Sequence, residues 1–166
     1  MSYCRECGEK LEMKYLEGEG MVPYCENCGQ YRFPQFNVAC SMIVLSPDQK
    51  EVVLIQQYGK KNYILVAGYV NKGEDAEDCA IREIREELGA EADCLHFNRS
   101  HYFSKSNTLM LNFTVVLKSK ELSCNWEVDR YSWFDLKTAR EKIKKNSLAA
   151  AFLNGYLDHS YSFPEY

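Results

Sequence analysis

Residues 68–90 read GYVNKGEDAEDCAIREIREELGA, and the spacing of charged and apolar residues in this stretch decides how the chain is interpreted. Each residue of a helix turns by roughly 100°, so Glu83, Glu86 and Glu87 share one arc of the predicted helix. Three apolar residues share another arc, namely Ile81, Ile84 and Leu88. The segment therefore predicts a helix that buries one face and presents carboxylates on the other.

The three glutamates form a cluster of like charges that repel one another unless a cation lies among them. Hard divalent cations such as Mg²⁺ are bound through oxygen ligands of this kind. A glutamate-rich helix face can also be solvated surface and nothing more. The fixed offsets of the flanking elements, Gly68 with Glu74 and Arg82 with Glu83, favour a metal site over plain surface.

Two CxxC knuckles lie near the start of the sequence, Cys4-Arg5-Glu6-Cys7 and Cys25-Glu26-Asn27-Cys28. Matched knuckles separated by about seventeen residues are typical of a tetrahedral zinc site with four thiolate ligands. A redox pair and a disulfide framework are the alternatives. The two knuckles match each other and no signal peptide is recognised before them, which favours zinc. We expect a structural zinc on Cys4, Cys7, Cys25 and Cys28.

The other cysteines are scattered among apolar or strand-like segments, and we expect them to be small buried hydrophobes. They are Cys40, Cys79, Cys94 and Cys124. Reduced thiols of both kinds fit a cytoplasmic location.

Length and composition indicate one ordinary domain with a small appended module. The chain has 166 residues, of which 46% are hydrophobic, as in a globular protein. No apolar run reaches the roughly eighteen residues that a membrane span needs. The net charge of −4 argues against broad electrostatic affinity for nucleic acid.

The pattern of apolar and turn residues predicts alternating strands and helices after a ribbon that ends near Phe33-Pro34. We expect strands at 38–45, 51–57, 63–66, 92–103, 108–118 and 127–134. The loop at 46–50 joins the first two as a hairpin, and the last three are expected to form an antiparallel meander. Helices are expected at 75–88, with Gly89 as its C-cap, at 141–145 and at 148–157. Together these elements indicate an α+β sandwich.

The 68–90 segment resembles the Nudix box, the catalytic loop-helix-loop of the Nudix hydrolases, at every defining position. The resemblance implies a pyrophosphohydrolase that depends on Mg²⁺ or Mn²⁺. It implies these roles: Glu83 and Glu87 as principal metal ligands, Glu86 as a further ligand or the residue that orients water, the carbonyl of Ala67 as a backbone ligand, and Glu74 with Arg82 as a structural pair. Such a site positions an attacking water and neutralises charge on phosphate oxygens, so it needs no serine or cysteine nucleophile.

More of the chain is similar to the zinc-ribbon Nudix enzymes called NADH pyrophosphatases or NAD⁺ diphosphatases. The similarity lies in Tyr3-Cys4-Arg5-Glu6-Cys7-Gly8, the second knuckle, Arg32-Phe33-Pro34 and Ser147-Leu148-Ala149. It implies a zinc ribbon at 1–34 and a Nudix domain at 35–166, folded as an α/β/α sandwich with a mixed sheet. These enzymes cleave NADH to nicotinamide mononucleotide and AMP, and some remove NAD caps from RNA.

The resemblance also implies substrate contacts, with several departures from the family pattern. Phe33, Tyr69 and Phe103 occupy positions of rings that stack on a base, although each could be ordinary core. The family motif Ser-Gln-Pro-Trp corresponds here to Ser100-His101-Tyr102-Phe103, so His101 and Phe103 are the candidate contacts there, together with Ala149 in the terminal segment. A lone histidine on a strand also fits a structural role. The family usually has a further acidic metal ligand downstream of the box, and Arg130 occupies that position here. Glu127 and Asp129 are the nearest acidic residues that could replace it.

Two classes of function follow. The first is an enzyme acting on a nucleoside diphosphate linked to a second group, with NADH, NAD⁺ or ADP-ribose ahead of nucleoside triphosphates, and with NAD-capped RNA as a further substrate. The second is a non-catalytic regulator whose ribbon binds nucleotide, RNA or a partner. The intact glutamate cluster favours the enzyme. The resemblance also implies a homodimer, with no role for a membrane.

Overall fold

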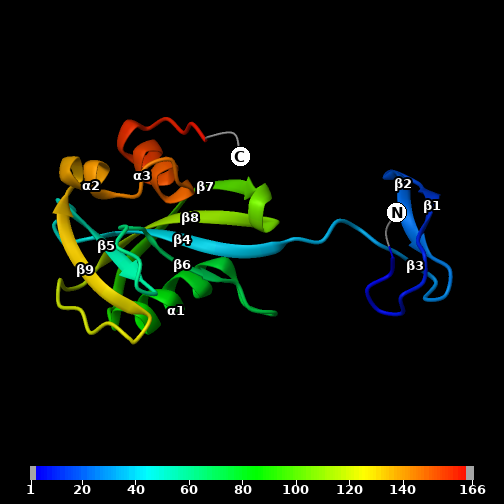
Figure 1. Cartoon of the computed structure of the whole chain (residues 1–166), viewed down its shortest axis with the longest axis horizontal. Helices are drawn as coiled ribbons and strands as arrows, with labels where there is room; N and C mark the ends of the chain where they lie inside the picture. Colours follow the sequence, from blue (N-terminus) through cyan, green and yellow to red (C-terminus); the bar gives the residue numbers. More distant parts are fainter. Residues whose placement is uncertain (1–2, 164–166) are drawn as a thin grey trace. The chain divides into compact units, whose positions relative to one another are not determined.

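The computed structural model describes residues 3–163, which divide between Phe36 and Asn37 into two compact units (Figure 1). The predicted domain boundary after residue 34 stays a prediction. The predicted domains, 1–34 and 35–166, include residues 1–2 and 164–166, which lie outside the described part of the chain. No helix in the described part has both the length and the apolar character needed to cross a bilayer.

The smaller unit is a three-stranded antiparallel sheet in the order β1-β2-β3. Its strands are β1 (Glu12–Leu16), β2 (Gly20–Cys25) and β3 (Gln30–Tyr31). Among the described residues of this unit, the buried hydrophobic side chains are Cys4, Val22 and Cys25. A core this small does not stabilise a sheet by apolar burial alone, so the cysteines must contribute in another way.

The larger unit contains a mixed six-stranded sheet in the order β7-β8-β4-β5-β9, with β6 paired to β4. The strands are β4 (Asn37–Leu45), β5 (Glu51–Gln57), β6 (Val66–Tyr69), β7 (Ala92–Phe103), β8 (Thr108–Leu117) and β9 (Val128–Asp135). The β4 and β8 strands are parallel, whereas the other pairs are antiparallel. The hairpin at 46–50 between β4 and β5 is confirmed.

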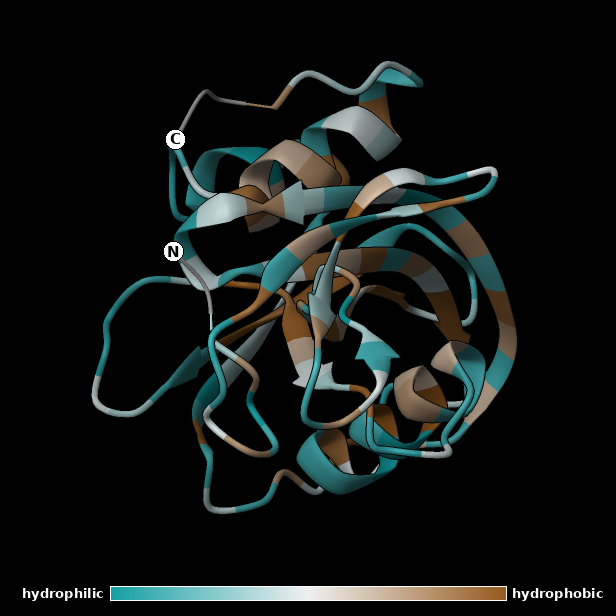
Figure 2. Ribbon diagram, turned by 90° about the vertical axis from the view of Figure 1, so that its right-hand side faces the viewer, coloured by the Kyte–Doolittle hydropathy of each residue, from teal (hydrophilic) through white to brown (hydrophobic). Residues whose placement is uncertain are grey.

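Helices cover both faces of this sheet, α1 (Ala76–Leu88) on one and α2 (Leu136–Lys142) with α3 (Leu148–Asp158) on the other (Figure 1). The central strand β4 alternates accordingly: Met42 and Val44 join the core under α1, whereas Ile43 and Leu45 join the core under α2 and α3. Figure 2 shows the hydrophobic strands enclosed between these helices. The predicted α+β sandwich with a mixed sheet is confirmed.

Three predicted elements are wrong in position or pairing. The helix expected at 141–145 instead begins at Leu136 and ends at Lys142, because Asp135 caps it by accepting a hydrogen bond from the Thr138 backbone at 3.0 Å. The strand near 127–134 does not extend the meander. The edge of β8 is occupied by β4, so β9 pairs with the free edge of β5.

The strand expected at 63–66 lies later in the chain, from Val66 to Tyr69. Ile64 forms only an isolated bridge with Ile55, and continuous pairing with β4 runs from Val66 to Tyr69. One edge of β4 is therefore shared, since β5 pairs with its last two residues and β6 with its first half. The C-terminal end of β5 and the strand β6 carry residues of the site described next.

Candidate active site

The helix α1 presents its carboxylates from a well-defined frame. It begins after Asp75 and ends at Gly89, whose left-handed backbone (φ 59°) donates a hydrogen bond to the Arg85 carbonyl at 3.0 Å. Its apolar arc is buried through Ile84 and Leu88. A Cβ on Gly89 would lie 2.5 Å from the Ser123 carbonyl oxygen, so this C-cap also allows the following loop to approach. The predicted helix and its glycine cap are confirmed.

Arg82 connects this helix to the loop before it. Its Nε and Nη1 lie 2.7 Å from carboxylate oxygens of Glu74 and Glu83, its Nη1 lies 2.9 Å from Glu86, and its Nη2 donates to the Tyr69 carbonyl at 3.0 Å. The guanidinium lowers the pKa of Glu74 to about 2. The predicted structural contact between Glu74 and Arg82 is confirmed, and one cation orders both loop and helix.

Gly68 leaves the space in which the Glu83 carboxylate lies. A Cβ at this glycine would stand 1.9 Å from Cδ of Glu83, so any other residue here would displace the Glu83 carboxylate. The Glu83 side chain is only 12% exposed and lies against bare backbone. The glycine that opens the sequence motif therefore sets the position of a carboxylate that follows it by fifteen residues.

Glu87 is the buried member of the cluster, with 3% of its surface exposed. Its Oε2 accepts a hydrogen bond from Nε2 of Gln57 at 3.0 Å. Burial, together with the negative charges of Glu83, Glu127 and Glu86, raises the pKa of Glu87 to about 7, although the Gln57 hydrogen bond acts in the opposite direction. A divalent cation beside this carboxylate would favour its ionised form and so lower the pKa of Glu87.

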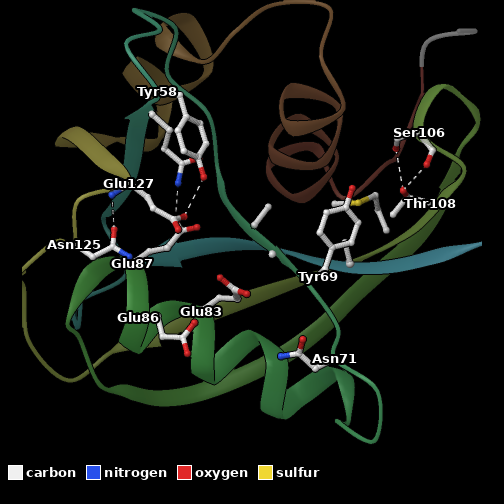
Figure 3. Close-up of a pocket in the computed structure, with 15 residues that line it drawn as sticks. Tyr58, Tyr69, Asn71, Glu83, Glu86, Glu87, Ser106, Thr108, Asn125 and Glu127 are labelled. Carbon is white, nitrogen blue, oxygen red and sulfur yellow. Dashed lines mark hydrogen bonds between the residues drawn. The ribbon is translucent and has the colours of Figure 1, made fainter.

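A cavity of about 520 Å³ brings the cluster together with several other predicted residues (Figure 3). Its lining includes Ala67, Tyr69, Glu83, Glu86, Glu87 and Glu127. Three sequence-distant segments supply them: strand β6, the carboxylate-bearing arc of α1 and the segment before β9. A volume of this size is typical of a small-molecule site.

The other predicted substrate contacts are not among the described residues that line this cavity. His101 stacks on Phe163 with ring centroids 3.9 Å apart, and burial lowers its pKa. Phe103 pairs across the sheet with Thr108, which does line the cavity. Ala149 packs against the core under α3, and Phe33 is half exposed in the smaller unit. Their substrate roles stay predictions.

The downstream acidic residue beside the cluster is Glu127. It receives a hydrogen bond from the Tyr58 hydroxyl at 3.0 Å, which raises the pKa of that phenol, and its backbone N–H donates to Asn125 Oδ1. Asp129 accepts instead from the Gly59 backbone at 2.6 Å and is absent from the described lining.

Sequence reasoning missed part of the lining, including Gln57, Tyr58 and Asn125. None of them belongs to a motif. The one local signal was the polar pair at the end of the apolar β5 run, directly before a tyrosine and a glycine.

The four knuckle cysteines form a second candidate metal site, in the smaller unit. Their Sγ atoms all lie within 4.8 Å of one another, with Cys4 and Cys28 3.8 Å apart and Cys7 and Cys25 3.5 Å apart. Four sulfurs at about 2.3 Å from a tetrahedral zinc would be roughly 3.8 Å apart. A left-handed glycine closes each knuckle by donating to the carbonyl of its first cysteine. The donor set and its spacing fit zinc.

Of the remaining cysteines, two are fully buried and two partly buried. Cys40 and Cys79 lie in the core under α1, as expected for small hydrophobes. Cys94 and Cys124 are only partly covered.

The model of the NUDIX domain family matches residues 35–154. The chain belongs to the Nudix family. The match includes the whole carboxylate site, and it ends within α3.

Sequence relatives extend this likeness into the smaller unit. The chain is 30% identical over 158 residues to the NAD-capped RNA hydrolase NudC of Pseudomonas aeruginosa, covering 93% of this chain and 55% of the relative. It is 24% identical over 154 residues to the protein of the same name from Vibrio cholerae, covering 91% and 55%. The chain thus spans about half the length of the curated relatives it matches.

Solved Nudix structures share the fold. A NUDIX hydrolase from Nitrosomonas europaea superimposes with a TM-score of 0.61 at 17% identity, covering 99% of this chain and 97% of that one. The NUDIX domain of NrtR from Shewanella oneidensis, crystallised with ADP ribose, gives 0.64 at 11% identity, covering 82% and 93%. At these identities the likeness concerns the fold alone.

Proposed function

We propose that this Nudix protein is a metal-dependent pyrophosphohydrolase that cleaves the phosphoanhydride of a nucleoside diphosphate linked to a second group, with NADH or NAD⁺ as the principal substrate. One observation carries the proposal. The carboxylates of Glu83, Glu87 and Glu127 converge on one cavity that also has an exposed aromatic ring, Tyr69, in its lining. Acidic ligands and a base-stacking surface are the two features that a dinucleotide diphosphate requires.

The acidic residues fit Mg²⁺ or Mn²⁺. Glu83 and Glu87, with the Ala67 carbonyl and Glu127, would hold the cation through oxygen donors, in keeping with the burial and the neighbouring negative charges that raise the pKa of Glu87. A bound divalent cation supplies charge neutralisation at the phosphate oxygens and a more acidic water. Arg82 occupies one oxygen of Glu83 and fixes its direction, so the carboxylate is oriented before a ligand arrives.

The chain's own residues then position the reactants. Gln57 orients Glu87 by its hydrogen bond, and Arg82 anchors Glu86, whose side chain is 55% exposed and can accept a proton from an attacking water. Hydrolysis adds one water across the P–O–P bridge, so NADH yields reduced nicotinamide mononucleotide and AMP. Holding the water in line with the breaking bond supplies most of the rate in such chemistry.

The order of substrates rests on the relatives. Proteins named NAD-capped RNA hydrolase match across both units of this chain, which supports NADH and NAD⁺ first and NAD-capped RNA as a further substrate. ADP-ribose is the alternative, because it presents the same diphosphate with a single base.

We further propose that the smaller unit binds one structural Zn²⁺ and contributes to a homodimer. The thiolate cluster replaces the missing apolar core, as in other small metal-dependent modules. Met13, Tyr15 and Met21 are more than half exposed, and the pairing of β1 with β2 puts Tyr15 opposite Met21. Exposed apolar side chains gathered on one face are typical of an interface.

The test is a rate comparison on purified protein with Mg²⁺ and with Mn²⁺, against NADH, NAD⁺, ADP-ribose, NAD-capped RNA and nucleoside triphosphates. We expect NADH turnover to exceed that of nucleoside triphosphates, and Glu83→Gln to reduce it by at least a hundredfold with the fold intact. Near-wild-type turnover in this variant would reject the assignment. Size-exclusion chromatography with light scattering tests the dimer, and a monomer at micromolar concentration would reject it.

A further inference from the structure

A tight turn joins β5 to the segment before β6, and its backbone is unusual. The Lys60 N–H donates to the Gln57 carbonyl at 3.1 Å, and the two central residues, Tyr58 and Gly59, both have left-handed backbones (φ 54° and 69°). Such a turn favours glycine or asparagine at both central positions. A tyrosine there is strained, and strain of this kind is retained where a side chain has a task.

The first three residues of this turn each donate a hydrogen bond to a different carboxylate: Gln57 to Glu87 at 3.0 Å, Tyr58 to Glu127 at 3.0 Å and Gly59 to Asp129 at 2.6 Å. Two of these carboxylates line the cavity. Glu87 belongs to α1, whereas Glu127 directly precedes β9 and Asp129 lies in β9. The turn therefore fixes the spacing between the helix-borne acids and the downstream acid.

The Tyr58 ring remains open to ligands although its hydroxyl is held. The residue is 61% exposed and lines the cavity, as does Tyr69 at 58% exposure. Figure 3 shows the two rings apart from each other, Tyr58 beside Glu87 and Glu127, and Tyr69 towards Ser106 and Thr108. The acidic cluster thus has an exposed aromatic surface on each side.

We propose that Tyr58 is a specificity-determining residue: its hydroxyl positions Glu127, and its ring stacks on the second planar group of a dinucleotide whose other base lies on Tyr69. This inference rests on the proposed pyrophosphohydrolase function and narrows its substrate class to molecules with a flat ring at both ends of the diphosphate. A diphosphate with a ring on one end uses one of the two tyrosines.

Two substitutions separate the ring from the hydroxyl. Tyr58→Phe keeps the ring and removes the hydrogen bond to Glu127. Tyr58→Asn removes the ring and suits the left-handed backbone, so the turn is kept. Tyr131→Phe, on the exposed side of β9, is the matched control for loss of an unrelated hydroxyl. Tryptophan fluorescence melts of each variant check that the larger unit, which holds both Trp126 and Trp133, remains folded.

Stacking of one base changes affinity by roughly five- to a hundredfold. We expect Tyr58→Asn to raise KM for NADH about tenfold and Tyr58→Phe to leave it within twofold, while Tyr58→Phe raises the Mg²⁺ concentration for half-maximal rate several-fold. With ADP-ribose, only one of Tyr58→Asn and Tyr69→Ala should raise KM. A KM for NADH within twofold of wild type in Tyr58→Asn would overturn the inference. An equal rise of this KM in Tyr58→Asn and Tyr58→Phe would overturn it as well.

A binding measurement keeps this test separate from the proposed activity. NADH fluorescence is titrated with each variant in Ca²⁺, and Tyr58→Asn should weaken binding about tenfold whether or not the protein turns NADH over. Wild type that binds NADH but does not hydrolyse it would reject the proposed function alone. Unchanged binding in Tyr58→Asn would reject the role of Tyr58 even if hydrolysis is observed.

Discussion

Glu87→Gln should abolish turnover and yet stabilise the metal-free protein, with a stabilisation that depends on pH. The wild-type carboxylate is 3% exposed, and burial holds its pKa at about 7 against roughly 4.3 for an unperturbed glutamate. The glutamine substitution removes the charge but keeps an oxygen that can accept the Gln57 hydrogen bond.

The sign and size of this stabilisation follow from the linkage between proton binding and folding. Below about pH 4 the carboxyl group is protonated in both folded and unfolded chains, so it adds no penalty. As pH rises towards 7 the unfolded chain ionises first, and above pH 7 the folded protein must hold a buried charge. A pKa difference of about 2.7, at 1.36 kcal/mol per pKa unit, destabilises the wild type by roughly 3–4 kcal/mol at pH 8.

The measurement is urea denaturation in magnesium-free buffer at pH 5 and pH 8, with zinc left in place and tryptophan fluorescence as the signal. Both tryptophans, Trp126 and Trp133, belong to the larger unit, so the signal reports on the Nudix fold. We expect Glu87→Gln to gain about 3 kcal/mol over wild type at pH 8 and much less at pH 5.

The matched control is Glu86→Gln, because the Glu86 side chain is 55% exposed. The free energy of unfolding of this variant should differ from that of wild type by less than about 1 kcal/mol at either pH. Saturating Mg²⁺ should stabilise wild type and not Glu87→Gln. The reasoning fails if Glu87→Gln is less stable than wild type at pH 8, or if its gain is the same at both pH values.

Three further perturbations test other parts of the account. Gly68→Ala should reduce kcat at least tenfold while the melting temperature falls little, because its Cβ would lie 1.9 Å from Cδ of Glu83; unaltered kinetics would contradict the packing argument. Arg82→Lys cannot reproduce the fork that joins Glu74 and Glu83, so we expect a ten- to hundredfold loss of kcat/KM, and a full rescue by lysine would show that charge alone suffices. Treatment with a strong chelator should release one Zn²⁺ per chain and make four thiols reactive towards a colorimetric reagent. Tryptophan fluorescence, which reports on the larger unit, should not change, and release of no zinc would reject the ribbon site.

The features that the sequence predicted well are those specified by neighbouring residues. The α1 helix shows its apolar arc, its glycine cap and its carboxylate arc within 23 residues, so periodicity locates it to within one residue. The cysteine knuckles are equally local, because each closes on itself through the glycine that follows it.

The features that were missed depend on contacts between distant segments. The pattern in 127–134 indicates a strand but not its partner, and the pairing with β5 follows from which edge of the sheet remains free. Glu87 looks like the exposed Glu86 in the helix pattern, but it is buried, and Gln57 and Asn125 from distant segments hydrogen-bond to its side chain and its backbone carbonyl. The start of α2 was missed because the capping contact of Asp135 with Thr138 was not recognised.

The central claim is that Glu83, Glu87 and Glu127 gather divalent cations around a scissile diphosphate. Anomalous diffraction from crystals grown with Mn²⁺ and a nonhydrolysable dinucleotide tests it most directly. We predict a manganese peak within coordination distance of carboxylate oxygens of Glu83 and Glu87 and of a phosphate oxygen. A dinucleotide bound in the cavity with its manganese away from both glutamates would contradict the account.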